Sequence, residues 1–378
     1  MAQTTTLRLR RLWLQIHKWI GLLLAILIVP ISVTGSALVW HDWLDETLNP
    51  GRYAVSGPVA LPPSAYAAAA QRAIGPGERV ASIRFPEGEG PIMVSASRPP
   101  QPGGGRPVRT NVWLDPADAR VLDVAASNGG AVQVLHVLHG SLMVPGAGRQ
   151  IVGWVGVAML VSCLTGLWLW WPVTGSVRRG FRWKRQNSTN ANLHHQFGFW
   201  ILLPLAMLSF TGAWISFPQF FGRFEASQPK SGGGGADRIR AMRARPLERT
   251  ALDADGALAL AQPHATGPLA AVTWPTDQSA EWKIAFQREG GPAEVEVGDA
   301  TREVSPPRPP RPETTARLMR RWHDGNGMGA LWQTIIFAGG IIPAILSVTG
   351  IVMWWRSRGW RSQLKRRRRA RPVPQPAE

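Results

Sequence analysis

The chain contains 378 residues, with 42 Lys and Arg against 24 Asp and Glu, a net charge of +18 and a single cysteine, Cys163. One cysteine excludes an intrachain disulfide and a thiolate metal cluster. Segments 1–18, 173–193 and 356–378 hold 18 of the basic residues and one acidic residue, so the excess charge follows the positive-inside rule of membrane proteins and does not predict nucleic-acid binding.

Four hydrophobic runs contain no Asp, Glu, Lys or Arg, and each reaches the roughly 20 residues that cross the apolar core of a bilayer. They are Trp19–Trp40, Ile151–Trp171, Phe197–Phe217 and Leu331–Trp355. Tryptophan gathers at their ends, as is typical of membrane interfaces. We therefore predict a membrane α-helical protein that contacts the lipid bilayer through four transmembrane helices, at 19–40, 151–171, 197–217 and 331–355.

The basic segments predict the orientation of these helices. The N-terminus 1–18, the connector 172–196 and the tail 356–378 are expected in the cytoplasm, which places residues 41–150 and 218–330 outside. The first hydrophobic run is too long for a signal peptide and no small-x-small cleavage site follows it, so we expect a retained helix.

Each external segment predicts a small α+β module. In the first, an alanine-rich helix at 64–74 precedes strands at 79–85, 92–97, 110–114 and 120–124. In the second, a short helix at 254–262 precedes strands at 270–274, 282–287 and 293–297.

A Thr-Gly pair recurs deep in each hydrophobic run, and the histidines keep a constant distance from it. The pairs are Thr34-Gly35, Thr165-Gly166, Thr211-Gly212 and Thr349-Gly350. His17 and His194 each precede their threonine by 17 residues, whereas His139 and His323 precede theirs by 26. This register predicts a duplicated helix pair, related by an axis along the membrane normal. The Thr-Gly pairs themselves are interpreted as packing or backbone-bonding features.

The duplicated histidines suggest a transmembrane haem protein, because a bis-histidine haem requires two imidazoles on opposing helices at the same depth. The register pairs His17 with His194 near the cytoplasmic face and His139 with His323 near the external face. A single histidine at a helix end is more often an interfacial residue, so it is the repetition that favours ligation. No C-x-x-C-H motif occurs, and we therefore expect two haem b groups bound non-covalently.

Other histidines leave alternatives. His136 lies three positions before His139 and therefore on the same helical face. It could replace His139 as a ligand, hydrogen-bond to it or face a substrate. His195 has the same ambiguity beside His194. His41 could act at the outer surface but has no repeat partner, and His264 is interpreted as a loop residue.

Several motifs resemble the PepSY-associated transmembrane family. They are His-Lys-Trp-Ile-Gly at 17–21, His-Gly-Ser-Leu at 139–142, Leu-Thr-Gly-Leu-Trp-Leu-Trp-Trp-Pro at 164–172 and Ser-Val-Thr-Gly-Ile-Val-Met-Trp-Trp at 347–355. The resemblance covers essentially the whole chain, including two external PepSY-like modules. Within the family the chain is most similar to bacterial inner-membrane ferric-siderophore reductases, which are four-helix di-haem proteins. The resemblance implies haem ligation by His17 with His194 and by His139 with His323, and places the external modules in the periplasm.

The expected function is an inner-membrane haem b oxidoreductase that reduces a ferric siderophore or another iron chelate on the periplasmic side. No nucleotide-binding motif is present, so the electron donor is expected to be a separate cytoplasmic protein, a diffusible flavin or a membrane quinol. One alternative is a non-enzymatic membrane module whose PepSY-like domains bind an envelope peptidase or another partner. Another is a subunit that passes electrons to a periplasmic protein.

Overall fold

The computed structural model describes residues 2–99, 107–171, 177–183, 186, 188–224, 243–288, 291–307 and 313–369. The chain divides into two compact units. The helical unit comprises residues 1–41, 135–226 and 313–378, and the sheet unit comprises 42–134 and 227–312. The sheet unit therefore falls within the two segments predicted to be external.

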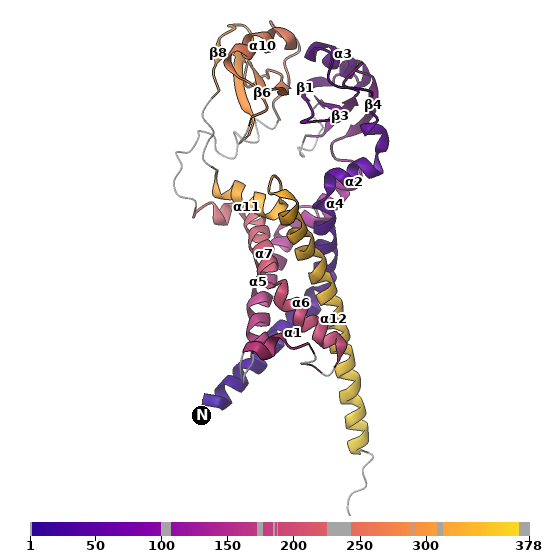
Figure 1. Ribbon diagram of the computed structural model, residues 1–378, viewed down its shortest axis with the longest axis vertical. Coiled ribbons are helices and arrows are strands. Elements are labelled where there is room, and N and C mark those ends of the chain that lie inside the picture. The colour runs from indigo at the N-terminus through magenta and orange to yellow at the C-terminus, as the bar shows by residue number, and fades with distance from the viewer. Residues whose placement is uncertain are drawn as a thin grey trace, which may run out of the picture. The chain divides into compact units, whose positions relative to one another are not determined.

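Three long apolar helices dominate the helical unit: α1 (Ala2–Leu38), α5 (Gly148–Trp170) and α12 (Gly329–Arg369) (Figure 1). Their segments Leu7–Leu38, Gly148–Trp170 and Gly329–Gly359 are long and apolar enough to cross a membrane. They correspond to the first, second and fourth predicted spans. The protein is thus a multi-pass membrane protein built on apolar helices.

The third predicted span is broken into two helices. Its residues form α6 (Thr189–Trp200) and α7 (Leu202–Ser216), which are bent by 63° and pass the same length and hydropathy test only when taken together. Pro204 explains the break, because a proline has no N–H to donate to the carbonyl four residues earlier and its ring collides with that carbonyl. That carbonyl belongs to Trp200, where α6 ends.

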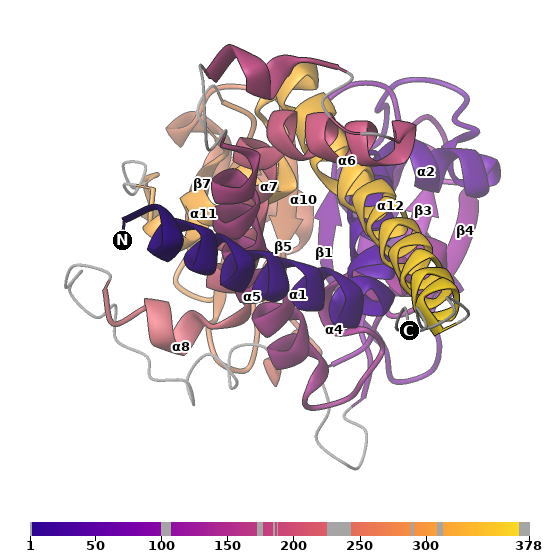
Figure 2. The same cartoon turned by 90° about the horizontal axis from the view of Figure 1, so that it is seen from below.

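Figure 2 shows the helices from below, and small residues lie where they pack together. Helix α1 packs against α5 and α12, and α5 packs against α7. A Cβ atom at Gly340 of α12 would overlap the Ser36 hydroxyl of α1, and one at Gly156 of α5 would lie 3.0 Å from the Ser209 carbonyl of α7. These glycines therefore serve close helix packing in the membrane unit.

Two shorter helices, α4 (Ala131–Ser141) and α11 (Thr315–Asp324), lie at the end of the bundle opposite α6 (Figure 1). The Thr314 hydroxyl caps the start of α11 by accepting from the Arg317 N–H. Gly325 ends the helix with a φ of +75°, a left-handed conformation that favours glycine. Most of α4 and all of α11 belong to the helical unit, although the sequence places both in the external segments.

The sheet unit contains one antiparallel sheet of eight strands in the order β4-β3-β2-β1-β5-β6-β7-β8. The first four strands are β1 (Arg79–Arg84), β2 (Ile92–Ser97), β3 (Arg109–Leu114) and β4 (Val121–Ala126). The last four are β5 (Leu269–Thr273), β6 (Glu281–Phe286), β7 (Ala293–Gly298) and β8 (Val304–Ser305). The two segments predicted as separate modules thus share a sheet, joined where β1 pairs with β5 in the register Ile83↔Val272.

Helices α3 (Pro63–Ala73) and α10 (Ala254–Ala261) pack with the alternating apolar residues of the strands to form one core. Trp282 on β6 is fully buried, and its indole Nε1–H donates to Asp299 Oδ1 at 2.9 Å. The α3 backbone N–H of Ser64 donates to Asp255 Oδ1 of α10 at 2.9 Å. The core therefore extends across both halves of the sheet.

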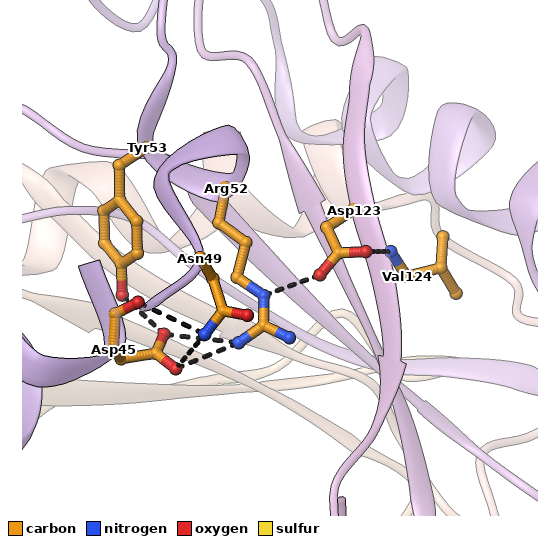
Figure 3. A network of polar contacts seen from close by, with 6 residues as sticks. All are labelled: Asp45, Asn49, Arg52, Tyr53, Asp123 and Val124. Atoms are coloured by element: carbon orange, nitrogen blue, oxygen red, sulfur yellow. Dashed lines mark hydrogen bonds and ion pairs between the residues drawn. The ribbon is translucent and has the colours of Figure 1, made fainter. Parts of the chain in front are cut away.

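A polar network ties the segment after α1 to the outer strand β4 (Figure 3). Arg52 is a residue of the segment that follows α2 (His41–Leu48). Its guanidinium forms ion pairs with Asp45 at 3.0 Å and with Asp123 of β4 at 2.6 Å. It also lies over the Trp113 ring, 4.2 Å from the centroid. The Tyr53 hydroxyl donates to Asp45 at 2.9 Å, and burial together with this carboxylate raises the pKa of the phenol.

Candidate functional site

The structure brings the four register histidines together as two pairs. The first histidine pair is His17 of α1 and His194 of α6, whose ring centroids lie 6.3 Å apart with an interplanar angle of 89°. The second histidine pair is His139 of α4 and His323 of α11, whose centroids lie 6.0 Å apart at 41°. Since α6 lies at the opposite end of the bundle from α4 and α11, the two pairs occupy opposite ends of the helical unit (Figure 1).

Three of these histidines contact the threonine of a Thr-Gly pair on a neighbouring helix. His17 Nδ1 lies 3.0 Å from Thr165 Oγ1, and His194 Nδ1 lies 2.9 Å from Thr349 Oγ1. In the second pair, His323 Nδ1 lies 2.9 Å from Thr211 Oγ1.

The threonine hydroxyls decide which ring nitrogen carries the proton. Each hydroxyl donates to a carbonyl of its own helix: Thr165 to Ser162 at 3.0 Å, Thr349 to Leu346 at 3.0 Å and Thr211 to Met207 at 2.9 Å. A hydroxyl has only one hydrogen to donate, so its oxygen is left to accept from the imidazole Nδ1–H. This tautomer leaves the Nε2 lone pair available to a metal.

His139 reaches the same tautomer through a different partner. Its Nδ1 lies 2.9 Å from the Ile31 carbonyl oxygen of α1. A carbonyl can only accept, so Nδ1 again carries the proton. Thr34, the register counterpart of the other three threonines, donates its hydroxyl to the Pro30 and Ile31 carbonyls instead.

The glycine of each Thr-Gly pair lies against the same histidine. A Cβ atom at Gly35 would lie 2.7 Å from His139 Cε1, and one at Gly212 would lie 3.2 Å from His323 Cε1. The corresponding distances are 3.3 Å from Gly166 to His17 and 3.7 Å from Gly350 to His194. Three Thr-Gly pairs thus contact an imidazole from another helix through both residues, and the fourth does so through Gly35 alone. The sequence interpretation treated these pairs as markers of register and as packing or backbone-bonding features, and it missed this contact. The recurrence of four such pairs beside four histidines was the signal that could have revealed it.

The remaining histidines lie outside the two pairs. His195 Nε2 lies 3.0 Å from the Gly180 carbonyl, and its ring stacks on Trp170 at 5.9 Å. His136 of α4 contacts His41 instead, with ring centroids 6.2 Å apart. His264 lies in the short helix η3 (Gln262–His264) of the sheet unit, whereas both pairs belong to the helical unit.

The second histidine pair lines a cavity of about 490 Å³ within the helical unit. This volume falls within the range of ligand pockets, roughly 300–1,000 Å³. Burial lowers the pKa of His323 to about 3, and the nearby His139 lowers it further. Burial likewise lowers the pKa of His139, against the opposing effect of the Ile31 carbonyl. Both imidazoles are therefore neutral at physiological pH, which is the form that binds metals.

The donor set fits a haem better than a bare metal ion. Within the described ranges, no group of three or more His, Cys, Asp or Glu side chains is arranged to hold a metal ion. A haem iron needs only two protein ligands, one on each side of the ring. Because a metal–imidazole nitrogen bond is about 2.0 Å long and each ring adds a little over 1 Å, two axial imidazoles have centroids roughly 6 Å apart. Both observed spacings match this value.

A comparison with protein families finds a match over most of the chain. The family model described as the PepSY-associated TM region matches residues 14–357, which include both histidine pairs and the whole sheet unit. No curated protein matches the chain.

Proposed function

Because the chain belongs to the PepSY-associated transmembrane family, we propose that it is a haem b protein that carries electrons across the bacterial inner membrane to reduce a ferric chelate in the periplasm. The observation that carries this proposal is the presence of two imidazole pairs with the spacing of axial ligands. In each pair the Nδ1 atoms are held by the protein and the Nε2 atoms are left as donors.

The proposed topology has four spans, with the bent α6–α7 pair as the third. The basic segments 1–18, 172–196 and 356–378 support a cytoplasmic location for both termini and the connector. Residues 41–150 and 218–330 are then periplasmic. In this topology the first histidine pair serves the cytoplasmic side and the second pair serves the periplasmic side.

His17 with His194 and His139 with His323 would hold one haem b each. A bis-histidine haem supplies a one-electron redox centre whose potential depends on its ligands and their hydrogen bonds. Thr165, Thr349, Thr211 and the Ile31 carbonyl fix the orientation of the four rings. Packed apolar helices around them exclude water and ions, so electrons could cross where ions cannot.

The proposed acceptor is a ferric siderophore or a related chelate. Such chelators hold ferric iron far more tightly than ferrous iron, so addition of one electron releases the metal. The cavity beside His139 and His323 supports a site for the haem of the second pair, from which the acceptor would take its electron. The proposed electron donor is separate from these residues: a cytoplasmic protein, a diffusible flavin or a membrane quinol.

The test is a spectrum of the purified full-length protein. We expect a Soret band, sharp low-spin bands on reduction and two haems per chain. The reduced protein should be reoxidised by a ferric siderophore in the absence of oxygen. A folded but colourless protein would contradict the proposal and favour a PepSY module that binds an envelope peptidase or another partner. Reoxidation only by a periplasmic protein would favour the electron-transfer subunit.

A further inference from the structure

The cavity around the second histidine pair is charged toward its external end and largely apolar deeper in the bundle. Apart from the histidines, its charged lining residues are Arg149, the second residue of α5, and Arg320 and Asp324 of α11. In the proposed topology all three belong to the external segments of the chain. The membrane helices supply an apolar lining that includes Ile28 of α1, Val155 of α5 and Leu205 of α7. The cavity therefore matches a ligand that has an apolar body and one charged edge.

The charges at the external end leave an excess of positive charge. The Arg320 guanidinium lies 3.7 Å from the Asp324 carboxylate, so these two charges offset each other. Within the described part of the chain, Arg149 forms no ion pair with a carboxylate, and its side chain bonds to a neutral carbonyl group instead. The charged edge of a matching ligand is therefore expected to be acidic.

A contact with α7 holds the Arg149 guanidinium in place. It donates one N–H to the Ile215 carbonyl oxygen, near the C-terminal end of α7. A guanidinium has five N–H donors, so further donors remain for an acidic ligand. Since Arg149 lies in the first turn of α5, the positive end of the helix dipole adds to its charge. Both features favour a carboxylate at this position.

We propose that Arg149 binds a propionate of the haem held by His139 and His323, so that the propionate edge of this haem faces the external end of the cavity. The proposal rests on the proposed function, because that function supplies the haem. A haem carries its two carboxylates on one edge, whereas its other edges are apolar, and this is the polarity of the cavity lining. Guanidinium groups bind carboxylates through two parallel hydrogen bonds, which fix orientation as well as affinity.

This orientation specifies which edge of the haem the acceptor meets. Arg149 is an exposed residue that also lines the cavity, so a carboxylate bound to it lies at the cavity mouth. The propionate edge then faces the side on which the ferric chelate is proposed to be reduced. The apolar edge lies among the membrane helices, where a charged group would be costly.

The experiment measures the rate at which the full-length protein in detergent releases haem to an excess of apomyoglobin. The protein is loaded either with haem b or with its dimethyl ester, whose propionates carry no charge. The His17→Ala background restricts the measurement to the second pair. Arg149→Gln should release haem b about three- to tenfold faster, a range between the effects of an exposed ion pair and of a buried charged hydrogen bond.

The dimethyl ester makes the test specific for the contact. The protein with Arg149 intact should release the ester faster than haem b by a similar factor, whereas Arg149→Gln should release both forms at the same rate. Arg149→Lys keeps the charge and should retain part of the difference. Arg223→Gln is the matched control, because Arg223 is exposed and does not line the cavity, and it should leave both rates unchanged.

The two release rates separate the possible outcomes. A difference between haem b and its ester that disappears in Arg149→Gln supports the contact. A difference that persists in Arg149→Gln, or that is absent with Arg149 intact, overturns it. Equal acceleration of both forms in Arg149→Gln would show that Arg149 only stabilises the protein around the cavity, and would also overturn it. A protein that binds two haems but shows no coupling refutes the orientation alone, whereas a protein that binds no haem refutes the proposed function as well.

Discussion

His194 Nδ1 of α6 lies 2.9 Å from Thr349 Oγ1 of α12, and the Thr349 hydroxyl donates to the Leu346 carbonyl at 3.0 Å. The Thr349 hydroxyl therefore links the His194 imidazole on α6 to the backbone of α12. Partners of this kind orient metal-ligating histidines and raise their basicity, and their removal typically costs about 10- to 100-fold in metal affinity. The contact makes Thr349 a positioning residue for the proposed haem at the first histidine pair.

Replacement of Thr349 by Val should weaken haem binding at the first pair by about tenfold and shift the midpoint potential of that haem, because the His194 Nδ1–H loses its acceptor. Thr349→Ser keeps a hydroxyl and should restore both properties. Haem titration and potentiometry follow the two effects. Thr34→Val is the matched control, since the Thr34 hydroxyl donates to the Pro30 and Ile31 carbonyls. Equal behaviour of the Val and Ser variants at position 349 would show that the hydroxyl has no positioning role.

Removal of single histidines should take away one haem at a time. His17→Ala and His194→Ala are expected to lose the same haem, because their rings face each other at 6.3 Å, and to retain the haem of the second pair. His139→Ala and His323→Ala should show the reverse pattern. The pyridine haemochromogen assay gives the haem content per chain. The pairing is wrong if His17→Ala and His194→Ala lose different haems, or if either loses both.

Replacement of a glycine of a Thr-Gly pair by alanine should be more disruptive the closer the new Cβ atom lies to its histidine. Gly35→Ala places a Cβ atom 2.7 Å from His139 Cε1, so either the ring or the helix must shift. Gly350→Ala places it 3.7 Å from His194 Cε1, an ordinary van der Waals contact. We expect Gly35→Ala to disturb the low-spin spectrum of the second pair and Gly350→Ala to leave the first unchanged. A spectrum that is equally sensitive to both changes would argue against a role of these glycine–histidine contacts in positioning the rings.

Local sequence patterns predicted most elements of the sheet unit. The predicted strands at 79–85, 92–97 and 110–114 agree with β1, β2 and β3 within one residue at each end, and burial alternates with a period of two along β3. The pairing of β1 with β5 was not predicted, since strands far apart in the chain leave no local signal of their neighbour.

The histidine pairs could be predicted from the register, but the hydrogen-bond partners of their rings could not. The register compared His17 with Thr34 of the same helix, whereas the structure places Thr165 of a different helix against His17. Contacts between helices depend on rotation and crossing angle, which a single sequence does not specify. The break at Ile201 has a local signal in Pro204, since a proline inside a hydrophobic run predicts a kink in the helix there.

The sheet unit should lose stability in acid through Asp115. Burial alone would raise the pKa of this carboxyl group, but the N–H groups of Ala117 and Ser56 and the charge of Arg120 outweigh it and hold the pKa below its usual 3.8. A lowered pKa stabilises the folded state above the unfolded value, and this contribution disappears as the pH falls through the folded value. Asp115→Asn should therefore lower the melting temperature of the full-length protein at pH 7, with a smaller difference near pH 3.

Asp118→Asn provides the control for that measurement, because the Asp118 side chain is more than half exposed. Differential scanning fluorimetry between pH 3 and 7 would record both variants against the unsubstituted protein. A difference for Asp115→Asn that stays constant over this range would mean that the carboxylate charge does not contribute.

The junction between β1 and β5 should make the two halves of the sheet unfold together. Ile83 and Val272 pair across this junction and are both fully buried in the shared core. Ile83→Ala should cost about 2–5 kcal/mol, as is typical of large-to-small core changes. Hydrogen exchange should then show faster opening in β6 and β7 as well as in β2 and β3. Val124→Ala on the outer strand β4, where the side chain is 40% exposed, should change the exchange rates little. If Ile83→Ala affects only the first four strands, the halves fold as separate modules despite their common sheet.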